Sequence, residues 1–131
     1  MNNKSYQLLT GVHPDLAKIV LEASRTVEFE VVEGVRTIMQ EIKYIAQGKS
    51  SLKNPYSCRH VPKGKPPYAR AIDLVPTVNG VRYPADLSKY GPMVKAMKAA
   101  ATKFSIPLVW GGDWTTFVDG PHFELDRKVY P

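Results

Sequence analysis

Two histidines and one aspartate in this chain occupy positions where such residues can bind a metal ion. His60 lies in a proline-rich polar segment, and His122 begins a short apolar segment directly after a Gly-Pro pair. Asp73 lies within the apolar run 71–75, where a carboxylate is costly unless a positive charge compensates it. Two imidazoles and one carboxylate can hold a catalytic zinc ion with its fourth position open to water. The three residues therefore predict a zinc site at which the pKa of water falls toward about 7.

Each of these residues also has a structural interpretation. His60 alone would be a polar loop residue, His122 a hydrogen-bonded strand residue, and Asp73 an outward-facing strand residue. Asp119 favours the joint interpretation, because a Gly-Pro turn separates it from His122 and would bring its carboxylate close to the metal. There it can act as general base toward water. The alternative is an ordinary aspartate that initiates a turn.

The segments that precede His60 predict a helix, a strand and a second helix. The first helix is expected from about His13 to Thr26, because Pro14 suits the first helical turn and Asp15 the positive helix end. Apolar residues recur along it at helical spacing, so one face is expected to be buried. A strand is expected around residues 29–31.

The second helix is expected to follow the N-cap residue Thr37 and to end near Gly48. Residues 49–70 are polar and rich in proline, and we expect them to form a long functional loop. A strand over 71–75 should be stopped by Pro76, and Asn79-Gly80 predicts a hairpin turn.

The C-terminal third predicts one long helix and two short strands. The helix is expected over 88–104, and the strands over 107–110 and 122–125. This order of elements predicts an α+β fold, with a small antiparallel sheet carrying helices on one side.

Composition limits the classes of function. The 131 residues suit one domain, and we expect residues 1–131 to form a single, monomeric catalytic domain. No apolar run approaches the roughly 20 residues of a membrane span, no secretory signal is evident, and a single cysteine excludes an intrachain disulfide. The formal charge of +6 suits an anionic partner, but the basic residues are dispersed, which argues against a nucleic-acid site.

Five blocks of the sequence carry a resemblance to a known family. They resemble the phage L-alanyl-D-glutamate endolysins, which are zinc peptidases of peptidoglycan related to the VanY-type D,D-carboxypeptidases and share a fold with the hedgehog signalling domain. The blocks run in one order along nearly the whole chain: VHPDL at 12–16, GVRT at 34–37 with Gln40, His60 with AID at 71–73, WGGDW at 110–114, and DGPHFEL at 119–125.

The resemblance implies a role for each site residue. It places the zinc ligands on His60, Asp73 and His122 and the general base on Asp119. It also implies that Arg36 holds the substrate or the developing oxyanion, a task that suits the fixed fork of a guanidinium. A structural salt bridge is the alternative for Arg36.

Other residues near these blocks have two interpretations each. Trp110 and Trp114 either line a substrate cleft or pack beneath the site, and Glu124 either orients a metal ligand or faces outward. Cys58 stands where the family usually has a serine, and a buried, unreactive thiol is expected there. The insertion at 61–70 lengthens the segment between His60 and Asp73 and would form a lip beside the substrate. The short segment before His122 leaves no room for the acidic, calcium-controlled loop of some relatives.

The resemblance implies hydrolysis of the L-Ala–D-Glu bond of the cell-wall stem peptide during host lysis. The enzyme would accumulate in the host cytoplasm and reach the periplasmic peptidoglycan after release. Three alternatives remain open at this point: a D,D-carboxypeptidase with the same zinc site, a non-catalytic zinc-stabilised wall-binding module, and a basic nucleic-acid binder.

Overall fold

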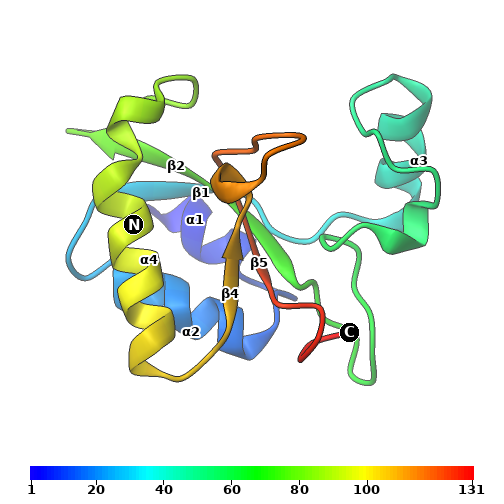
Figure 1. Cartoon of the computed structure of the whole chain (residues 1–131), viewed down its shortest axis with the longest axis horizontal. Coiled ribbons are helices and arrows are strands. Elements are labelled where there is room, and N and C mark those ends of the chain that lie inside the picture. Colours follow the sequence, from blue (N-terminus) through cyan, green and yellow to red (C-terminus); the bar gives the residue numbers. More distant parts are fainter.

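Five strands form the sheet that carries the site. The computed structural model describes all residues 1–131. The antiparallel sheet has the order β1-β2-β5-β4, and the short strand β3 pairs with β2 (Figure 1). The strand bounds are Phe29–Glu33 for β1, Ala71–Val78 for β2, Val81–Arg82 for β3, Leu108–Trp110 for β4 and His122–Leu125 for β5.

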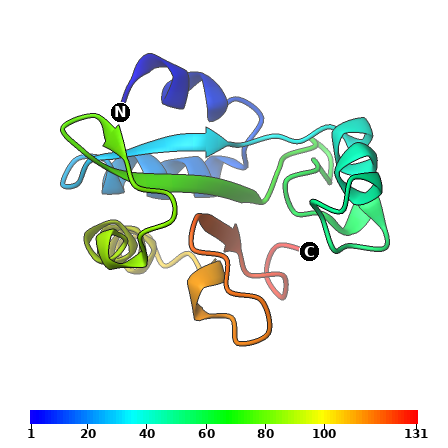
Figure 2. The same cartoon turned by 90° about the horizontal axis from the view of Figure 1, so that it is seen from above.

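Four helices and three short 3-10 turns connect these strands. The helices are α1 (Asn3–Leu8), α2 (Pro14–Ala23), α3 (Ile38–Ala46) and α4 (Gly91–Lys103), and the 3-10 turns are η1 (Pro55–Ser57), η2 (Leu87–Lys89) and η3 (Gly111–Asp113). In Figure 2 the strands run between α4 at one end of the molecule and α3 at the other. No helix has the length and apolar character that crossing a membrane requires.

The apolar core lies between the sheet and the helices α2 and α4. These two helices pack against each other, and their buried faces meet the inward side chains of β2 and β5. Successive residues of a strand point to opposite faces, so Ile72 and Phe123 enter the core while Asp73 and His122 face the other way. The core face and the site are therefore two sides of the same pair of strands.

Local sequence signals explain how the N-terminal elements begin. The Nδ1 atom of His13 accepts a hydrogen bond from the backbone N–H of Asp15 at 3.1 Å, with Pro14 in the first turn of α2. Thr37 and Gln40 form a capping box at the start of α3, with hydrogen bonds of 3.1 and 2.8 Å. The predicted helix starts near His13 and Thr37 are confirmed, as is the hairpin that joins β2 and β3.

Three elements differ from the sequence predictions. Helix α1 was not predicted; Asn2 caps it, and the buried Ser5 hydroxyl accepts a hydrogen bond from the N–H of Val31, which fastens it to β1. Strand β2 continues through Pro76, because β5 pairs with β2 only as far as Asp73 and the missing N–H costs less beyond that point. The long helix begins at Gly91 rather than at residue 88, since η2 occupies the preceding turn.

Helix α3 stands apart from the helices that cover the core. Its main contact is with η1, and Glu41 is its one fully buried residue. The α3 segment and the loop after it therefore form a separate lobe beside the sheet, visible at the right of Figure 1.

Gly34 joins β1 to this lobe at a point with no room for a side chain. A Cβ atom there would lie 2.1 Å from the carbonyl oxygen of Leu8 and 3.2 Å from Cγ2 of Val12. We expect Gly34→Ala to lower the free energy of unfolding by about 1–3 kcal/mol, because a backbone oxygen cannot move aside like a flexible side chain. Urea denaturation measures this. The control Gly91→Ala adds a methyl group with no heavy atom within 4 Å, and equal losses in the two variants would contradict the prediction.

Candidate metal centre

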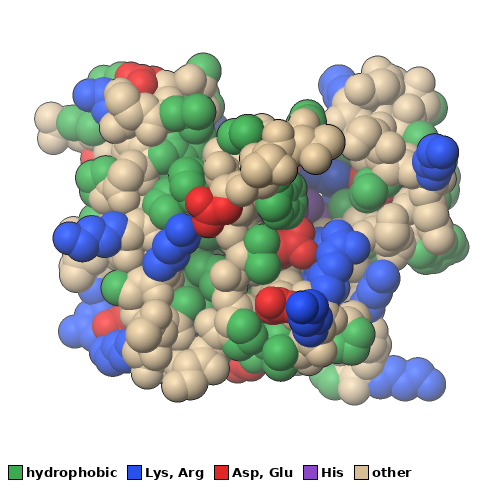
Figure 3. Space-filling view, viewed as in Figure 1, with side chains coloured by type: hydrophobic (Ala, Val, Ile, Leu, Met, Phe, Trp, Pro, Cys, Tyr) green, Lys and Arg blue, Asp and Glu red, His purple; other side chains and the backbone are tan.

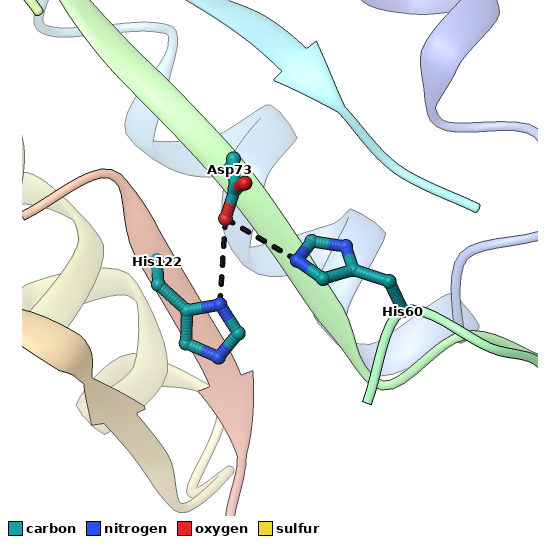
Figure 4. Close-up of side chains that lie close together, drawn as sticks. All are labelled: His60, Asp73 and His122. Carbon is teal, nitrogen blue, oxygen red and sulfur yellow. Dashed lines mark ion pairs between the residues drawn. The ribbon is translucent and has the colours of Figure 1, made fainter. Parts of the chain in front are cut away.

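The pairing of β2 with β5 places two of the predicted ligands directly opposite each other. Asp73 and His122 are partners in this antiparallel register, and His60 reaches the same point from the loop that precedes β2. Figure 4 shows both imidazoles directed at the Asp73 carboxylate. One oxygen, Oδ1 of Asp73, lies 3.3 Å from Nε2 of His60 and 3.4 Å from Nδ1 of His122.

The outer nitrogen of His60 fixes the orientation of its ring. Nδ1 lies 2.8 Å from the carbonyl oxygen of Gly34, which can only accept, so Nδ1 carries the hydrogen and donates it. In the neutral ring Nε2 then directs a lone pair at Asp73. The backbone of this loop is tied to the same segment, because the N–H of Arg36 donates to the carbonyl of His60 at 2.9 Å.

Glu124 gives the ring of His122 a corresponding partner. The two residues are two apart on β5 and share a face, and Nε2 of His122 lies 2.9 Å from Oε1 of Glu124. Burial lowers the pKa of His122, but its contacts with Asp73 and Glu124 outweigh burial and raise the pKa to about 9. In the protonated ring, Nδ1 carries a hydrogen that faces Asp73. In the neutral ring with its hydrogen on Nε2, Nδ1 has a lone pair that can bind a metal ion.

The Asp73 carboxylate is a buried negative charge at the centre of the site. Its Oδ1 is buried and has no hydrogen-bond partner. Burial raises the pKa of Asp73, but the facing imidazoles outweigh this effect and hold the pKa well below its usual range, so the group is charged. An uncompensated buried carboxylate is strongly disfavoured.

The spacing of the three ligand atoms fits a small divalent ion. All three atoms lie within 4.8 Å of one another. Ligands at zinc-like distances of about 2.0–2.1 Å and the tetrahedral angle are separated by about 3.3–3.4 Å. The two separations measured from Asp73, 3.3 and 3.4 Å, match that value. The residues therefore form a candidate His-His-Asp metal site by geometry as well as by donor type.

A tight turn brings Asp119 to the same site. Gly111 packs against this turn so closely that a Cβ atom would lie 2.5 Å from the carbonyl oxygen of Asp119 and 3.1 Å from Cβ of His122. The indole N–H of Trp110 donates to the carbonyl of Gly120 at 2.7 Å and fixes the turn from below. Burial and the charge of Asp73 raise the pKa of Asp119 above its ordinary value.

The candidate ligands lie in a cleft between the α3 lobe and the body of the protein. The pocket has a volume of about 320 Å³, within the range of small-molecule sites. Figure 3 shows a histidine side chain in the hollow beside α3, with basic side chains around it. The pocket is lined by His60, Asp73, Asp119 and His122, by Arg36, Cys58, Arg59 and residues 48–52 and 57, and by Trp114, Phe117, Glu124 and Arg127.

Arg36 lies in this pocket but is held by two carboxylates. Nε and Nη2 donate to Glu33 at 2.7 and 2.8 Å, and Nη1 donates to Glu41 at 2.7 Å. Nη1 also lies 3.6 Å from Sγ of Cys58, and the guanidinium stacks over the Tyr44 ring at 4.8 Å. The structural salt bridge considered for Arg36 therefore exists, and four of its five N–H groups have partners.

The remaining predicted residues are distributed between the pocket and its supports. The Trp114 ring lies 5.1 Å from that of His122 and borders the pocket, whereas Trp110 stacks on Phe123 beneath it. The insertion at 61–70 contributes no residue to the pocket lining, so the expected lip beside the substrate is not found there. Its Tyr68–Arg70 end instead lies against Gly11 and His13.

Sequence reasoning missed several residues that support the site. The Gly34 carbonyl, the buried Glu41 and the arginines Arg59 and Arg127 contact site residues only because of the fold. Arg59 is 4% exposed, and its Nη2 donates to the carbonyls of Leu125 and Tyr130 at 2.8 Å each. The contacts of the Gly34 carbonyl and of Arg59 join residues that are remote along the chain, and the short spacing of Arg127 from Glu124 does not by itself place Arg127 beside the pocket.

Comparisons with known proteins agree with this geometry. The model of a family described as phage L-alanyl-D-glutamate peptidase matches residues 1–129. The L-alanyl-D-glutamate peptidase of Escherichia phage T5 is 34% identical over 130 residues, which cover 98% of this chain and 89% of that protein. The L-alanyl-D-glutamate peptidase of Listeria phage A118 is 30% identical over 111 residues, which cover 82% of this chain and 34% of that protein.

A solved structure is similar over the whole chain. The crystal structure of the Serratia marcescens L-Ala D-Glu endopeptidase ChiX matches with a TM-score of 0.86 and 32% sequence identity, covering 100% of this chain and 92% of that one. These matches confirm the α+β fold class and the family resemblance drawn from the sequence.

The contact between Glu124 and His122 yields a test of the metal site. Glu124→Gln keeps the side-chain volume but removes the charge that fixes the His122 ring, so we expect divalent-metal affinity to fall about 10- to 100-fold. Calorimetric titration with Zn²⁺ as the probe measures this. Glu22→Gln, which removes a carboxylate paired with Arg25 and Lys103 on the surface, should bind as the parent does. Unchanged affinity in Glu124→Gln would contradict the assignment.

Proposed function

The chain belongs to the phage L-alanyl-D-glutamate peptidase family, and from this premise we propose how its residues hydrolyse the bond between L-alanine and D-glutamate. The observation that carries the proposal is the convergence of His60, Asp73 and His122 on one point in the cleft. We assign these three residues as ligands of a catalytic zinc ion. When bound, zinc polarises a carbonyl group and makes water acidic enough to lose a proton near neutral pH.

Asp119 is the general base in this proposal. Its carboxylate lies in the same pocket as the three ligands, and burial together with the charge of Asp73 raises its pKa. A raised pKa brings a carboxyl group closer to the working pH, where it can both accept and return a proton. Asp119 takes the proton of the attacking water and then passes it to the departing amine of D-glutamate.

Arg36 and Trp114 are proposed to contact the substrate. After the contacts with Glu33, Glu41 and Cys58, one N–H at Nη2 of Arg36 remains to donate to a substrate oxygen. Trp114 stands beside His122 and supplies an apolar wall that limits the access of bulk water.

The wider role follows from the family. We propose that residues 1–131 act as one catalytic domain in phage lysis, made in the host cytoplasm and acting on periplasmic peptidoglycan after release. The formal charge of +6 assists its approach to the anionic envelope.

Metal removal tests the zinc assignment and the bond cleaved together. Digestion of purified sacculi should leave L-alanine on the glycan and release the rest of the stem, as determined by mass spectrometry. We expect chelator to abolish this product and stoichiometric Zn²⁺ to restore it. Release of one terminal D-alanine per stem would instead identify a D,D-carboxypeptidase, and cleavage that persists in chelator would contradict the metal assignment.

Substitution of Asp119 tests the general base. We expect Asp119→Ala to retain zinc binding but to lose about 10²–10⁴ in turnover, because proton transfer from water then has no positioned acceptor. The matched control is Asp113→Ala, which removes an exposed carboxylate paired with Lys98 on the neighbouring 3-10 turn. Turnover of soluble muropeptides and zinc content measure the two effects. Full turnover by Asp119→Ala would refute the role.

A further inference from the structure

The proposed substrate carries a negatively charged carboxylate that none of the proposed catalytic residues binds. Glutamate has two carboxyl groups, and only one of them can continue the stem peptide. The other remains a free carboxylate on the residue whose amine leaves during hydrolysis. On the basis of the proposed function, we propose that Arg127 binds this free carboxylate and makes the enzyme selective for D-glutamate over its carboxamide.

Three arginines line the cleft, and their contacts distinguish them. Arg36 lies between the carboxylates of Glu33 and Glu41, so these three side chains together carry a net negative charge. Arg59 is buried, and its Nη2 is committed to two backbone carbonyls. Neither guanidinium has a free fork, meaning two adjacent N–H groups that together can bind a carboxylate.

Arg127 differs from both because its fork is free. Its Nε lies 3.3 Å from Oε2 of Glu124, and neither Nη1 nor Nη2 has a hydrogen-bond partner. The side chain is 59% exposed, yet it borders the pocket that contains His60, Asp73 and His122. A carboxylate can therefore be bound at both terminal nitrogens without breaking the contact to Glu124.

The charges around Arg127 leave a net positive group on this wall. Glu124 contacts two guanidinium groups, Nε of Arg59 at 3.3 Å and Nε of Arg127 at 3.3 Å. One carboxylate thus faces two cations, and the surplus charge lies on the exposed member of the pair. A substrate carboxylate completes this arrangement, since a guanidinium binds a carboxylate through two parallel charge-assisted hydrogen bonds.

The backbone of Arg127 is fixed well enough to give specificity. The side chain of Asp126 accepts a hydrogen bond from the backbone N–H of Lys128 at 2.8 Å. The backbone carbonyl of Asp126 accepts one from the N–H of Tyr130, also at 2.8 Å. The hydroxyl of Tyr130 donates to Asp15 at 2.7 Å, which fastens this turn to α2. Arg127 is therefore presented from an anchored turn beside β5.

Lys49 is the other basic residue whose charge could serve this purpose. It lines the opposite wall, and its ammonium lies 5.9 Å from the centre of the Tyr44 ring. An ammonium group is a point charge without the planar fork that matches a carboxylate. Selectivity for carboxylate over carboxamide is therefore assigned to Arg127, and Lys49 becomes an arm of the test.

The test compares two soluble muropeptides that differ at one group, D-glutamate in one and its carboxamide in the other. We expect the zinc-loaded parent enzyme to prefer the carboxylate by about 10- to 100-fold in kcat/KM, as a charge-assisted bidentate contact implies. Arg127→Gln should lose this preference because kcat/KM falls for the carboxylate substrate and stays unchanged for the carboxamide. Arg127→Lys should keep part of the preference. Lys128→Gln, the matched control, removes the same charge from the neighbouring exposed residue and should keep the preference.

Each result separates the inference from the proposed function. If the parent cleaves neither muropeptide, both fail; if it cleaves the two at equal rates, only the role of Arg127 fails. If Arg127→Gln slows both substrates equally, Arg127 merely supports Glu124 and His122, and the inference is overturned. Loss of the preference in Lys49→Gln but not in Arg127→Gln would move the contact to the opposite wall and overturn it as well.

Discussion

The register between β2 and β5 is the constraint on which the site depends. It places Asp73 opposite His122 on one face of the sheet, while Ile72 and Phe123 enter the core on the other. A shift of one residue would exchange these faces, burying the carboxylate in the core and exposing the apolar side chains. The same burial that stabilises the domain therefore also fixes the alignment of two candidate metal ligands.

A second constraint is that each imidazole is engaged on both sides. The carbonyl of Gly34 holds Nδ1 of His60, and the carboxylate of Glu124 holds Nε2 of His122. The nitrogens that remain converge on a buried oxygen of Asp73, which has no hydrogen-bond partner of its own. The charge of Asp73 is balanced by the facing imidazoles, and His122 can release its proton when a cation takes its place, so the three side chains are already directed at the candidate metal position.

The sequence predicts features that depend on neighbouring residues more reliably than features that depend on distant ones. The N-cap at Thr37, the Asn79-Gly80 hairpin and the short strand at His122 follow from local rules and are confirmed. The continuation of β2 through Pro76 and the docking of α1 by Ser5 depend on which strands lie alongside, and no local pattern reports this. The ligand types could be inferred from residues and family resemblance, but their distances required the register.

The three arginines of the cleft show the same limit for charge. The sequence does not reveal the partners of these cations, whereas the fold surrounds Arg36 with two carboxylates and gives Arg59 and Arg127 one to share. A buried guanidinium must be satisfied by the protein itself, whereas an exposed one can keep its donors hydrated until a ligand displaces the water. The arginine with the fewest internal partners, Arg127, therefore keeps a free pair of terminal nitrogens, whereas Arg36, which is held by two carboxylates, keeps a single free N–H.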